Sequence, residues 1–365
     1  MLADLDSLEP ELEPEGKRID ADRPPKLTDR RNAIAALERI AHVLEREREP
    51  SYRVRAFRNA AAVVRALPDA ELEERGRCGT LHGLAGIGPV TARVIAEALA
   101  GATPTYLQRL EREAPLVVDD ALALRRALRG DCHVHSDWSD GGSPIEEMAR
   151  TAIDLGHEYI VLTDHSPRLT VARGLSAERL REQLDVVRGI NQGLAPFRIL
   201  TGIEVDILED GSLDQEPDLL AQLDVVVASV HSKLRMPQAE MTPRLLTAIR
   251  NPHMDVLGHC TGRIVVGRGR PESEFDADAV FATCREHHVA VEINSRPERL
   301  DPPMRLLKLA IETGCRLAVD TDAHAPGQLD WQLHGCERAA ACDVSAEMVI
   351  NTMPADELVA WTRTT

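Results

Sequence analysis

Short apolar runs recur through the last two thirds of the chain, and each ends on, or leads directly into, a polar residue. These runs centre on residues 131–135, 159–163, 198–205, 224–230, 254–258, 289–293 and 316–321. Helical runs fill the intervals, as in Ile145–Leu155, Ala177–Asn191, Pro217–Leu223 and Asp278–His287. Alternation of strands and helices predicts a mostly parallel sheet, and seven repeats predict a closed α/β barrel within residues 129–365.

The preceding part of the chain, residues 27–115, is predicted to be all-helical. Asn32–Glu47 has apolar residues at 34, 37, 40, 41 and 44, and further helices are predicted at Tyr52–Leu67 and Val90–Leu99. Between the last two lies LHGLAGIGP, residues 81–89. Glycines there would let the main chain approach a phosphate, whose charge the next helix N-terminus favours. An ordinary turn is the alternative for this short pattern.

Two other segments contain no predicted element. Residues 1–26 are acidic and proline-rich, with the stretches LEPELEPEG and DADRPPK, and are predicted to form a disordered tail. Residues 116–128 are predicted to link the helical module to the barrel.

Composition and cysteine spacing indicate the cellular compartment. Hydrophobic residues make up 43% of the chain, yet no apolar run is long enough to span a membrane, and no secretory leader pattern opens the sequence. The seven cysteines are irregularly spaced and form no CxxC pair, which fits reduced thiols. We therefore expect a cytoplasmic protein without a membrane partner.

Charge is distributed unevenly. The chain carries a net charge of −17, but residues 27–115 hold 14 Arg against 12 Asp and Glu, which leaves +2. A nearly neutral, arginine-studded module on an acidic protein is a candidate anion-binding surface, with Arg53, Arg55 and Arg58 as candidate DNA contacts. An ordinary solvated helical face is the alternative.

The polar residues at the strand ends are of types that bind metal ions. They include His133, His135, His165, Glu204, His231, His259, Asp322 and His324. Barrel strands bring their C-terminal ends to one face, so these side chains are expected to converge. Imidazole and carboxylate ligands without thiolates suit Mn²⁺, Zn²⁺ or Fe. The pattern predicts a metal-dependent hydrolase.

The motifs HVHSDWSDG, LTDHS, GIEVDILEDGSLD, SVHSK, GHCTGR, EINSRPERLD and DTDAHA resemble the PHP (polymerase and histidinol phosphatase) family over residues 129–350. The resemblance implies a distorted (β/α)7 barrel with two or three divalent metal ions. It implies one metal held by His133, His135, Glu204 and Asp322, and a second held by Glu204, His231 and His259. It implies a third metal held by Asp140, His165 and His324, with the SDG form at Asp140 typical of the polymerase-linked branch.

Several bases follow the strand ends and could clamp a phosphate oxygen. They are Lys233, Arg263, Arg268, Arg296 and Arg299, and a surface ion pair is the equal alternative for each. As catalytic residues we expect Asp322, Glu204, His165, Lys233 and Arg263.

The segment SYRVRAFRNAAAVVRAL followed by LHGLAGIGPVTARVIAEAL resembles the N-terminal helix–hairpin–helix domain of family X DNA polymerases, over residues 28–112. The resemblance implies that Gly86 and Gly88 grip the DNA backbone without reading its sequence. Lyase variants of that family use a lysine on the helix after the hairpin. Here Val90–Leu99 offers only Arg93, which stays protonated, so lyase activity is not expected. Residues 116–130 are too few for a polymerase palm, so DNA synthesis is not expected either.

These patterns predict a metal-dependent phosphoesterase that acts on DNA, as a 3′→5′ exonuclease or 3′-end-processing enzyme in DNA repair. A small-molecule phosphatase of the histidinol-phosphate type is one alternative, and a non-catalytic DNA-binding accessory protein is another. Because every proposed ligand follows residue 130, the barrel is also expected to hydrolyse small phosphoesters without residues 1–115.

Overall fold

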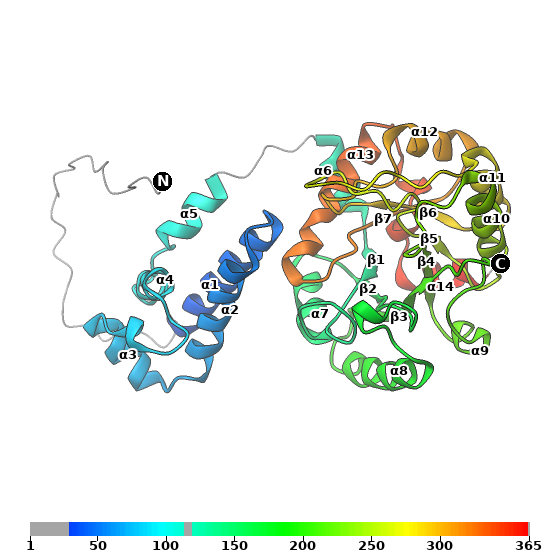
Figure 1. The fold of residues 1–365 in the computed structure, drawn as a ribbon. Coiled ribbons are helices and arrows are strands. Elements are labelled where there is room, and N and C mark those ends of the chain that lie inside the picture. The colour runs from blue at the N-terminus through cyan, green and yellow to red at the C-terminus, as the bar shows by residue number, and fades with distance from the viewer. Residues whose placement is uncertain (1–28, 113–118, 364–365) are drawn as a thin grey trace.

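The computed structural model describes residues 29–112 and 119–363, which form a helical module and a barrel domain (Figure 1). The predicted tail, residues 1–26, lies outside the described residues. The strands of the barrel are β1 (Gly130–Val134), β2 (Tyr159–Leu162), β3 (Arg198–Asp206), β4 (Val225–Ser229), β5 (Val256–Leu257), β6 (Ala290–Asn294) and β7 (Leu317–Asp320). All seven predicted strands are therefore present in the described part of the chain.

The strands pair in parallel and in chain order, from β1 to β7. Val134, at the end of β1, bridges Ala323 just after β7, so the ring is nearly closed. This confirms the predicted distorted barrel. Strand β5 is shorter than the apolar run 254–258, because only Val256 and Leu257 pair with both neighbouring strands.

Helices cover the outside of the barrel, as the alternating pattern predicts. They are α7 (Ile145–Asp154), α8 (Ala177–Asn191), α9 (Pro217–Leu220), α10 (Gln238–Ile249), α11 (Ala277–Glu286), α12 (Met304–Thr313), α13 (Gln332–Ala340) and α14 (Ala355–Thr362). The expected linker 116–128 contains a further helix, α6 (Asp119–Ala127), which packs against α13 through Ala121 and Leu124. No helix among the described residues is both long enough and apolar enough to cross a membrane.

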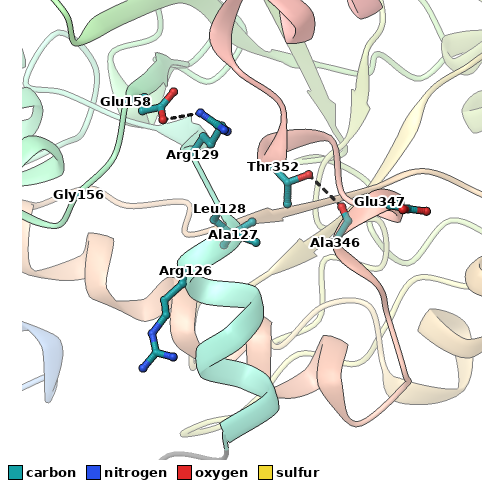
Figure 2. A pocket seen from close by; sticks show the side chains of 9 residues that line it. All are labelled: Arg126, Ala127, Leu128, Arg129, Gly156, Glu158, Ala346, Glu347 and Thr352. Carbon is teal, nitrogen blue, oxygen red and sulfur yellow. Dashed lines mark hydrogen bonds and ion pairs between the residues drawn. The ribbon is translucent and has the colours of Figure 1, made fainter.

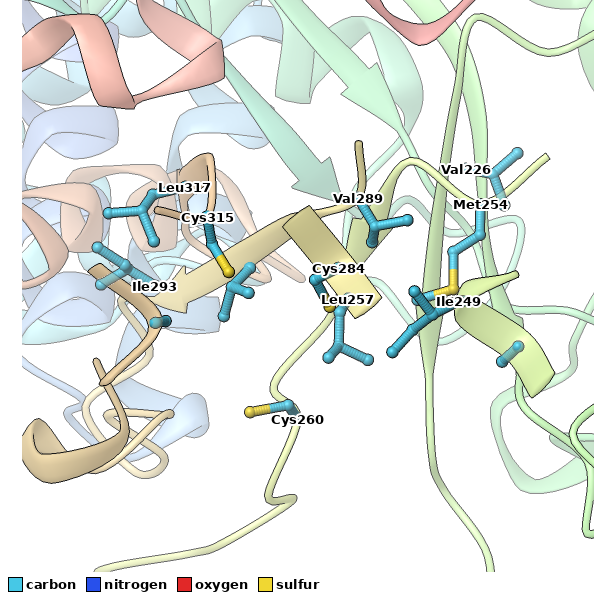
Figure 3. Close-up of a cluster of buried hydrophobic side chains, with 14 of the residues drawn as sticks. Val226, Ile249, Met254, Leu257, Cys260, Cys284, Val289, Ile293, Cys315 and Leu317 are labelled. Atoms are coloured by element: carbon cyan, nitrogen blue, oxygen red, sulfur yellow. The ribbon is translucent and has the colours of Figure 1, made fainter. Parts of the chain in front are cut away.

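Aliphatic side chains fill the layer between the sheet and its helices (Figure 3). Leu257, Ile293 and Leu317 lie on strands, and each is buried. Full burial of such a side chain contributes about 1.5–3 kcal/mol. Cys284 and Cys315 pack among these side chains as free thiols, which agrees with the expectation of reduced cysteines.

The helical module consists of α1 (Asp29–Arg46), α2 (Ser51–Ala66), α3 (Asp69–Cys78), α4 (Pro89–Leu99) and α5 (Thr105–Arg112). Its core includes Leu37, Ile40 and Phe57, all buried. The glycine turn leads directly into α4. Gly86 has φ +87°, a conformation that favours glycine.

The module docks on the barrel through α1 and a 3₁₀ helix, Pro326–Trp331. The Gly327 N–H donates to Glu45 (2.7 Å), and the Trp331 indole donates to the Arg46 carbonyl (2.8 Å). His42 lies 2.6 Å from Asp330. A Cβ on Gly327 would meet the His42 carbonyl at 2.6 Å, so the close approach requires glycine. Because this 3₁₀ helix begins two residues after His324, removal of the module is expected to disturb the barrel, in contrast to the expectation from the sequence.

Candidate metal centre

The nine proposed metal ligands converge at the C-terminal ends of the barrel strands. Three groups have ligand atoms within 4.8 Å of one another. They are His135, Asp140, His165 and His324; His133, His135 and Asp322; and His165, Glu204 and His231. His259 joins them because its Nε2 lies 2.9 Å from Glu204 Oε1. The groups overlap more than the resemblance implied, since His135 and His165 each belong to two of them.

The ligand atoms fit metal binding because many are buried without a hydrogen bond. His133 Nε2, both ring nitrogens of His135 and of His231, and Glu204 Oε2 are in this state. Leaving a buried polar group unsatisfied costs about 1–3 kcal/mol. Divalent metals would satisfy one nitrogen of each ring and the Glu204 oxygen, and the donor set of imidazoles and carboxylates suits Mn²⁺, Zn²⁺ or Fe.

The electrostatic environment favours the metal-binding protonation states of the two carboxylates and of His135, whereas neighbouring carboxylates raise the pKa of His133 and His231 despite their burial. Burial alone would raise the pKa of Glu204, but His231, His133 and His165 hold it well below its usual range. Asp322 likewise has a lowered pKa despite burial, because Arg296 and other bases lie beside it. Burial and the nearby His324 lower the pKa of His135. The carboxylates are thus ionised and His135 is neutral, as metal ligands must be.

A buried carboxylate that the sequence reading missed, Glu292 on β6, orients two of the histidines. Its Oε1 lies 2.6 Å from His133 Nδ1, and its Oε2 accepts the backbone N–H of His259 (2.5 Å) and a bond from Asn294 Nδ2 (3.1 Å). A carboxylate on the far nitrogen of a ligand histidine fixes the ring and its tautomer. The alternation in AVEIN, which puts Glu292 and Asn294 on one face, is the signal that could have found it.

Two further features hold the ligand loops in place. Asp164 accepts hydrogen bonds from the Ser136 hydroxyl (2.6 Å) and from the Gln183 amide (2.6 Å), which fixes the loop between His135 and Asp140. Asp322 has φ +54°, a left-handed conformation that aspartate tolerates better than most residues. Such strained positions often occur at functional sites.

The five candidate phosphate-binding bases lie in different surroundings. Arg296 Nη1 donates to the Asp322 carbonyl (3.0 Å), and Arg299 Nε donates to Asp322 Oδ2 (3.1 Å), so both reach the centre. Arg263 instead donates to the carbonyls of Arg299 and Leu300 and so holds the loop that carries Arg299. Lys233 is exposed, with φ +54°, and Arg268 is exposed as well.

A second hollow lies away from this centre (Figure 2). It is lined by residues around the start of β1, including Arg126, Arg129 and Glu347, and by none of the nine proposed ligands. Arg129 is paired with Glu158 at 2.6 Å. Barrel active sites lie at the C-terminal strand ends, so this hollow at the opposite end is no candidate for the chemistry.

Of the three arginines proposed to contact DNA, two form hydrogen bonds within the described part of the protein and one does not. Arg53 bonds to Glu49 and to the Tyr106 hydroxyl (2.8 Å). Arg58 bonds to Glu45 (2.9 Å) and to Ser143 on the barrel (3.2 Å), so it helps to join the two domains. Among the described residues Arg55 forms no hydrogen bond or ion pair, and it is exposed.

The hairpin glycines also differ from each other. Gly86 has a left-handed conformation, and a Cβ there would lie 3.2 Å from Val63. Gly88 has φ −88°, and a Cβ there would meet nothing within 4 Å. The fold therefore explains glycine at residue 86, whereas it places no steric requirement on residue 88.

Comparisons with known proteins agree with this architecture. Residues 131–296 match the PHP domain, and residues 29–103 match a helix-hairpin-helix domain. The DNA polymerase/3′-5′ exonuclease PolX of Bacillus subtilis (strain 168) is 41% identical over 64% of this chain. The match spans only 41% of that relative, less than half of its length.

A probable phosphatase of Thermoanaerobacter sp. (strain X514) is 30% identical over 61% of this chain and 89% of its own length. Among solved structures, the histidinol phosphate phosphatase of Lactococcus lactis, complexed with zinc, L-histidinol and phosphate, matches 60% of this chain and 93% of its own. That match has a TM-score of 0.43 at 17% identity. With its seven parallel strands, its converging ligands and these sequence relatives, the chain belongs to the PHP family of metal-dependent phosphoesterases.

Proposed function

We propose that this phosphoesterase acts on DNA and removes nucleotides from 3′ ends, as a 3′→5′ exonuclease or 3′-end-processing enzyme in DNA repair. The observation that carries the proposal is the docking of a helix–hairpin–helix module directly beside the metal centre. Glu45 and Arg46 of the module contact the 3₁₀ helix that follows His324. A phosphate-gripping module in this place would deliver a DNA end to the ligands.

Three divalent metals, or two, would be held by the nine ligands, with Glu204 shared between two of them. Bound divalent metals activate water and neutralise charge on phosphate oxygens. His165 links two ligand groups, because its Nδ1 lies 2.8 Å from Glu204 Oε2 and its Nε2 lies 3.4 Å from Asp140 Oδ1. Glu292 keeps His133 in the tautomer that leaves Nε2 free for a metal.

The guanidinium groups of Arg296 and Arg299 are placed to bind non-bridging phosphate oxygens. Both bond to Asp322, so a phosphate held at the metal ligands would lie within their reach. Lys233 is exposed and unpaired among the described residues, and we assign it a phosphate contact at the rim. Arg263 would act indirectly, because its side chain bonds to the Arg299 carbonyl and so positions the loop that carries Arg299.

The hairpin would bind the DNA backbone through the first amides of α4, which lack acceptors within the helix. Pro89 opens this helix without an N–H of its own, and the Gly88 N–H donates to the Thr91 hydroxyl (2.9 Å), so the amides left to face a phosphate are those of Val90 and Thr91. Binding of this kind is independent of base sequence. Polymerase and lyase activities are not part of the proposal, since the chain has no lysine on α4 and no palm between module and barrel.

A small-molecule phosphatase is the second candidate, and the likeness to a probable phosphatase over most of that protein's length favours it. Both candidates use the same metal centre, so they must be separated by substrate. The protein should be stripped with a chelator and reloaded with Mn²⁺, Zn²⁺ or Fe²⁺. Its kcat/KM should then be measured on a single-stranded oligonucleotide and on histidinol phosphate.

The proposal expects a higher kcat/KM for the oligonucleotide with at least one of the three metals. Rapid release of phosphate from histidinol phosphate by every metal form, with the oligonucleotide left intact, would favour the second candidate. Failure to hydrolyse either substrate, in protein shown to contain metal, would support the non-catalytic alternative.

A further inference from the structure

A cleft of about 540 Å³ lies between the helical module and the barrel. Module residues Arg48, Arg55 and Arg58 line one side, and Arg296 and Gln328 line the other. Ligand sites usually measure about 300–1,000 Å³, so the cleft has the volume of a binding site. Neither domain forms it alone.

Several residues that line the cleft contact His324, one of the proposed metal ligands. Gly142, which lines the cleft, donates its N–H to the His324 carbonyl (2.7 Å). The Gln328 side chain accepts the His324 N–H (2.7 Å), and Arg296 Nη1 lies 3.1 Å from His324 Nδ1. The cleft therefore adjoins the metal centre at His324.

In the described part of the chain, one arginine that lines the cleft is not paired with a carboxylate. Three carboxylates line it, and each is bound by an arginine: Glu45 by Arg58 (2.9 Å), Glu298 by Arg48 (2.9 Å) and Glu49 by Arg53. Arg55, on the same helix as Arg58, has no ion pair or hydrogen bond within residues 29–112 and 119–363. An unpaired guanidinium on the wall of a cleft is a strong ligand for a phosphate group.

We propose that the cleft holds the nucleic acid strand beside the scissile phosphodiester, and that Arg55 binds a phosphate beyond the one hydrolysed. This inference rests on the proposed function and goes further, because it makes the module part of the substrate site. A small phosphomonoester has no second phosphate and gains nothing from the cleft. The arrangement therefore favours oligonucleotides over mononucleotides and other small esters.

The test compares Arg55→Ala with Arg77→Ala. Arg77 is also exposed and unpaired among the described residues, and it lies on α3, far from the barrel in Figure 1. Both changes remove one positive charge from the module, so any general effect of charge is matched. The substrates are a thymidine tetranucleotide with three phosphodiesters, a dinucleotide with one, and histidinol phosphate as a small ester, each tested with the metal-loaded full chain.

For Arg55→Ala, we expect the ratio of tetranucleotide to dinucleotide kcat/KM to fall roughly five- to tenfold, mainly through KM. The salt dependence of tetranucleotide KM should also weaken, by about 0.7 in the log–log slope for one lost phosphate contact on a single strand. Arg77→Ala should keep the wild-type ratio and slope.

Equal ratios and slopes in wild type, Arg55→Ala and Arg77→Ala would overturn the inference while leaving the proposed function in place. If the wild-type protein hydrolyses histidinol phosphate but neither nucleotide, the proposed function fails first and the inference fails with it. The two failures are thus distinguishable in one experiment.

Discussion

Glu292→Gln is the most informative single change at the metal centre, because it alters one atom and keeps the shape of the side chain. Glu292 is fully buried and accepts from donors on both oxygens. If the new amide nitrogen replaces Oε2, it faces two donors, the His259 N–H and Asn294 Nδ2. If it replaces Oε1, it faces His133 Nδ1 and forces the ring proton onto Nε2.

Either arrangement is unfavourable for metal binding. In the first, buried donors oppose one another, and each lost bond to a charged acceptor is worth about 1.5–3 kcal/mol. In the second, His133 Nε2, which lies 3.4 Å from Glu204 Oε2, carries a proton where the metal lone pair is needed. Loss of such a partner typically costs 10–100-fold in metal affinity, or about 1.4–2.8 kcal/mol.

The assay is Mn²⁺ titration by calorimetry of chelator-stripped protein, with circular dichroism to check the fold. Glu286→Gln is the matched control, since Glu286 is an exposed carboxylate on α11 just before the same strand. We expect weaker metal binding for Glu292→Gln alone. Wild-type affinity and turnover in Glu292→Gln, with metal content unchanged, would refute the assignment of Glu292 as the group that orients His133.

Four other outcomes are expected. Asp322→Asn should lower hydrolysis of every substrate by about 100-fold or more while circular dichroism stays at wild type, because it removes a ligand charge. Deletion of residues 1–115 should lower both thermal stability and small-ester turnover, since it strips α1 from the 3₁₀ helix after His324; an unaffected barrel would contradict the docking described above. Gly88→Ala should fold normally, because its Cβ meets nothing within 4 Å, yet should weaken DNA binding severalfold; unchanged affinity would reduce the hairpin to a turn. Burial, with Arg125 beside it, lowers the pKa of His157 from 6.5 to about 3. The free energy of unfolding should therefore fall as pH drops below 6.5, by ~2 kcal/mol at pH 5, because the unfolded chain binds the proton more readily. Denaturant melts of His157→Gln should lack that part of the pH dependence.

Much of the barrel, and the convergence of the proposed ligands, could be predicted from the sequence for a simple physical reason. Buried parallel strands are continuous apolar runs, and the barrel puts their polar ends at one face, so strand position and ligand position are read from the same pattern. Helix Ala177–Asn191 has the predicted bounds, and β4 and β6 each begin one residue later than predicted.

What the sequence did not reveal depends on long-range contacts. Glu45 and Gly327 meet across 282 positions, and no local pattern indicates that pairing. Glu292 could not be predicted because it lies inside an apolar run, and its role depends on its contact with the ring of His133. Helix α6 lies within the predicted linker, because a short helix between polar residues becomes recognisable only through its packing on α13.

The sequence likewise gives the number of arginines in the module, but it does not show which of them are paired with carboxylates. Arg53, Arg55 and Arg58 are equivalent in the sequence, yet carboxylates occupy two of them and leave Arg55 free. Which arginine faces a ligand is decided by the neighbours that fold beside it.

The most direct test of the account is digestion of a 5′-labelled oligonucleotide in Mn²⁺, with the wild-type protein and Asp322→Asn side by side. Wild type should give a ladder of labelled fragments that shorten progressively from the 3′ end, and Asp322→Asn should leave the oligonucleotide intact. An intact oligonucleotide with metal-loaded wild type, or the same ladder from Asp322→Asn, would contradict the claim that this metal centre hydrolyses DNA.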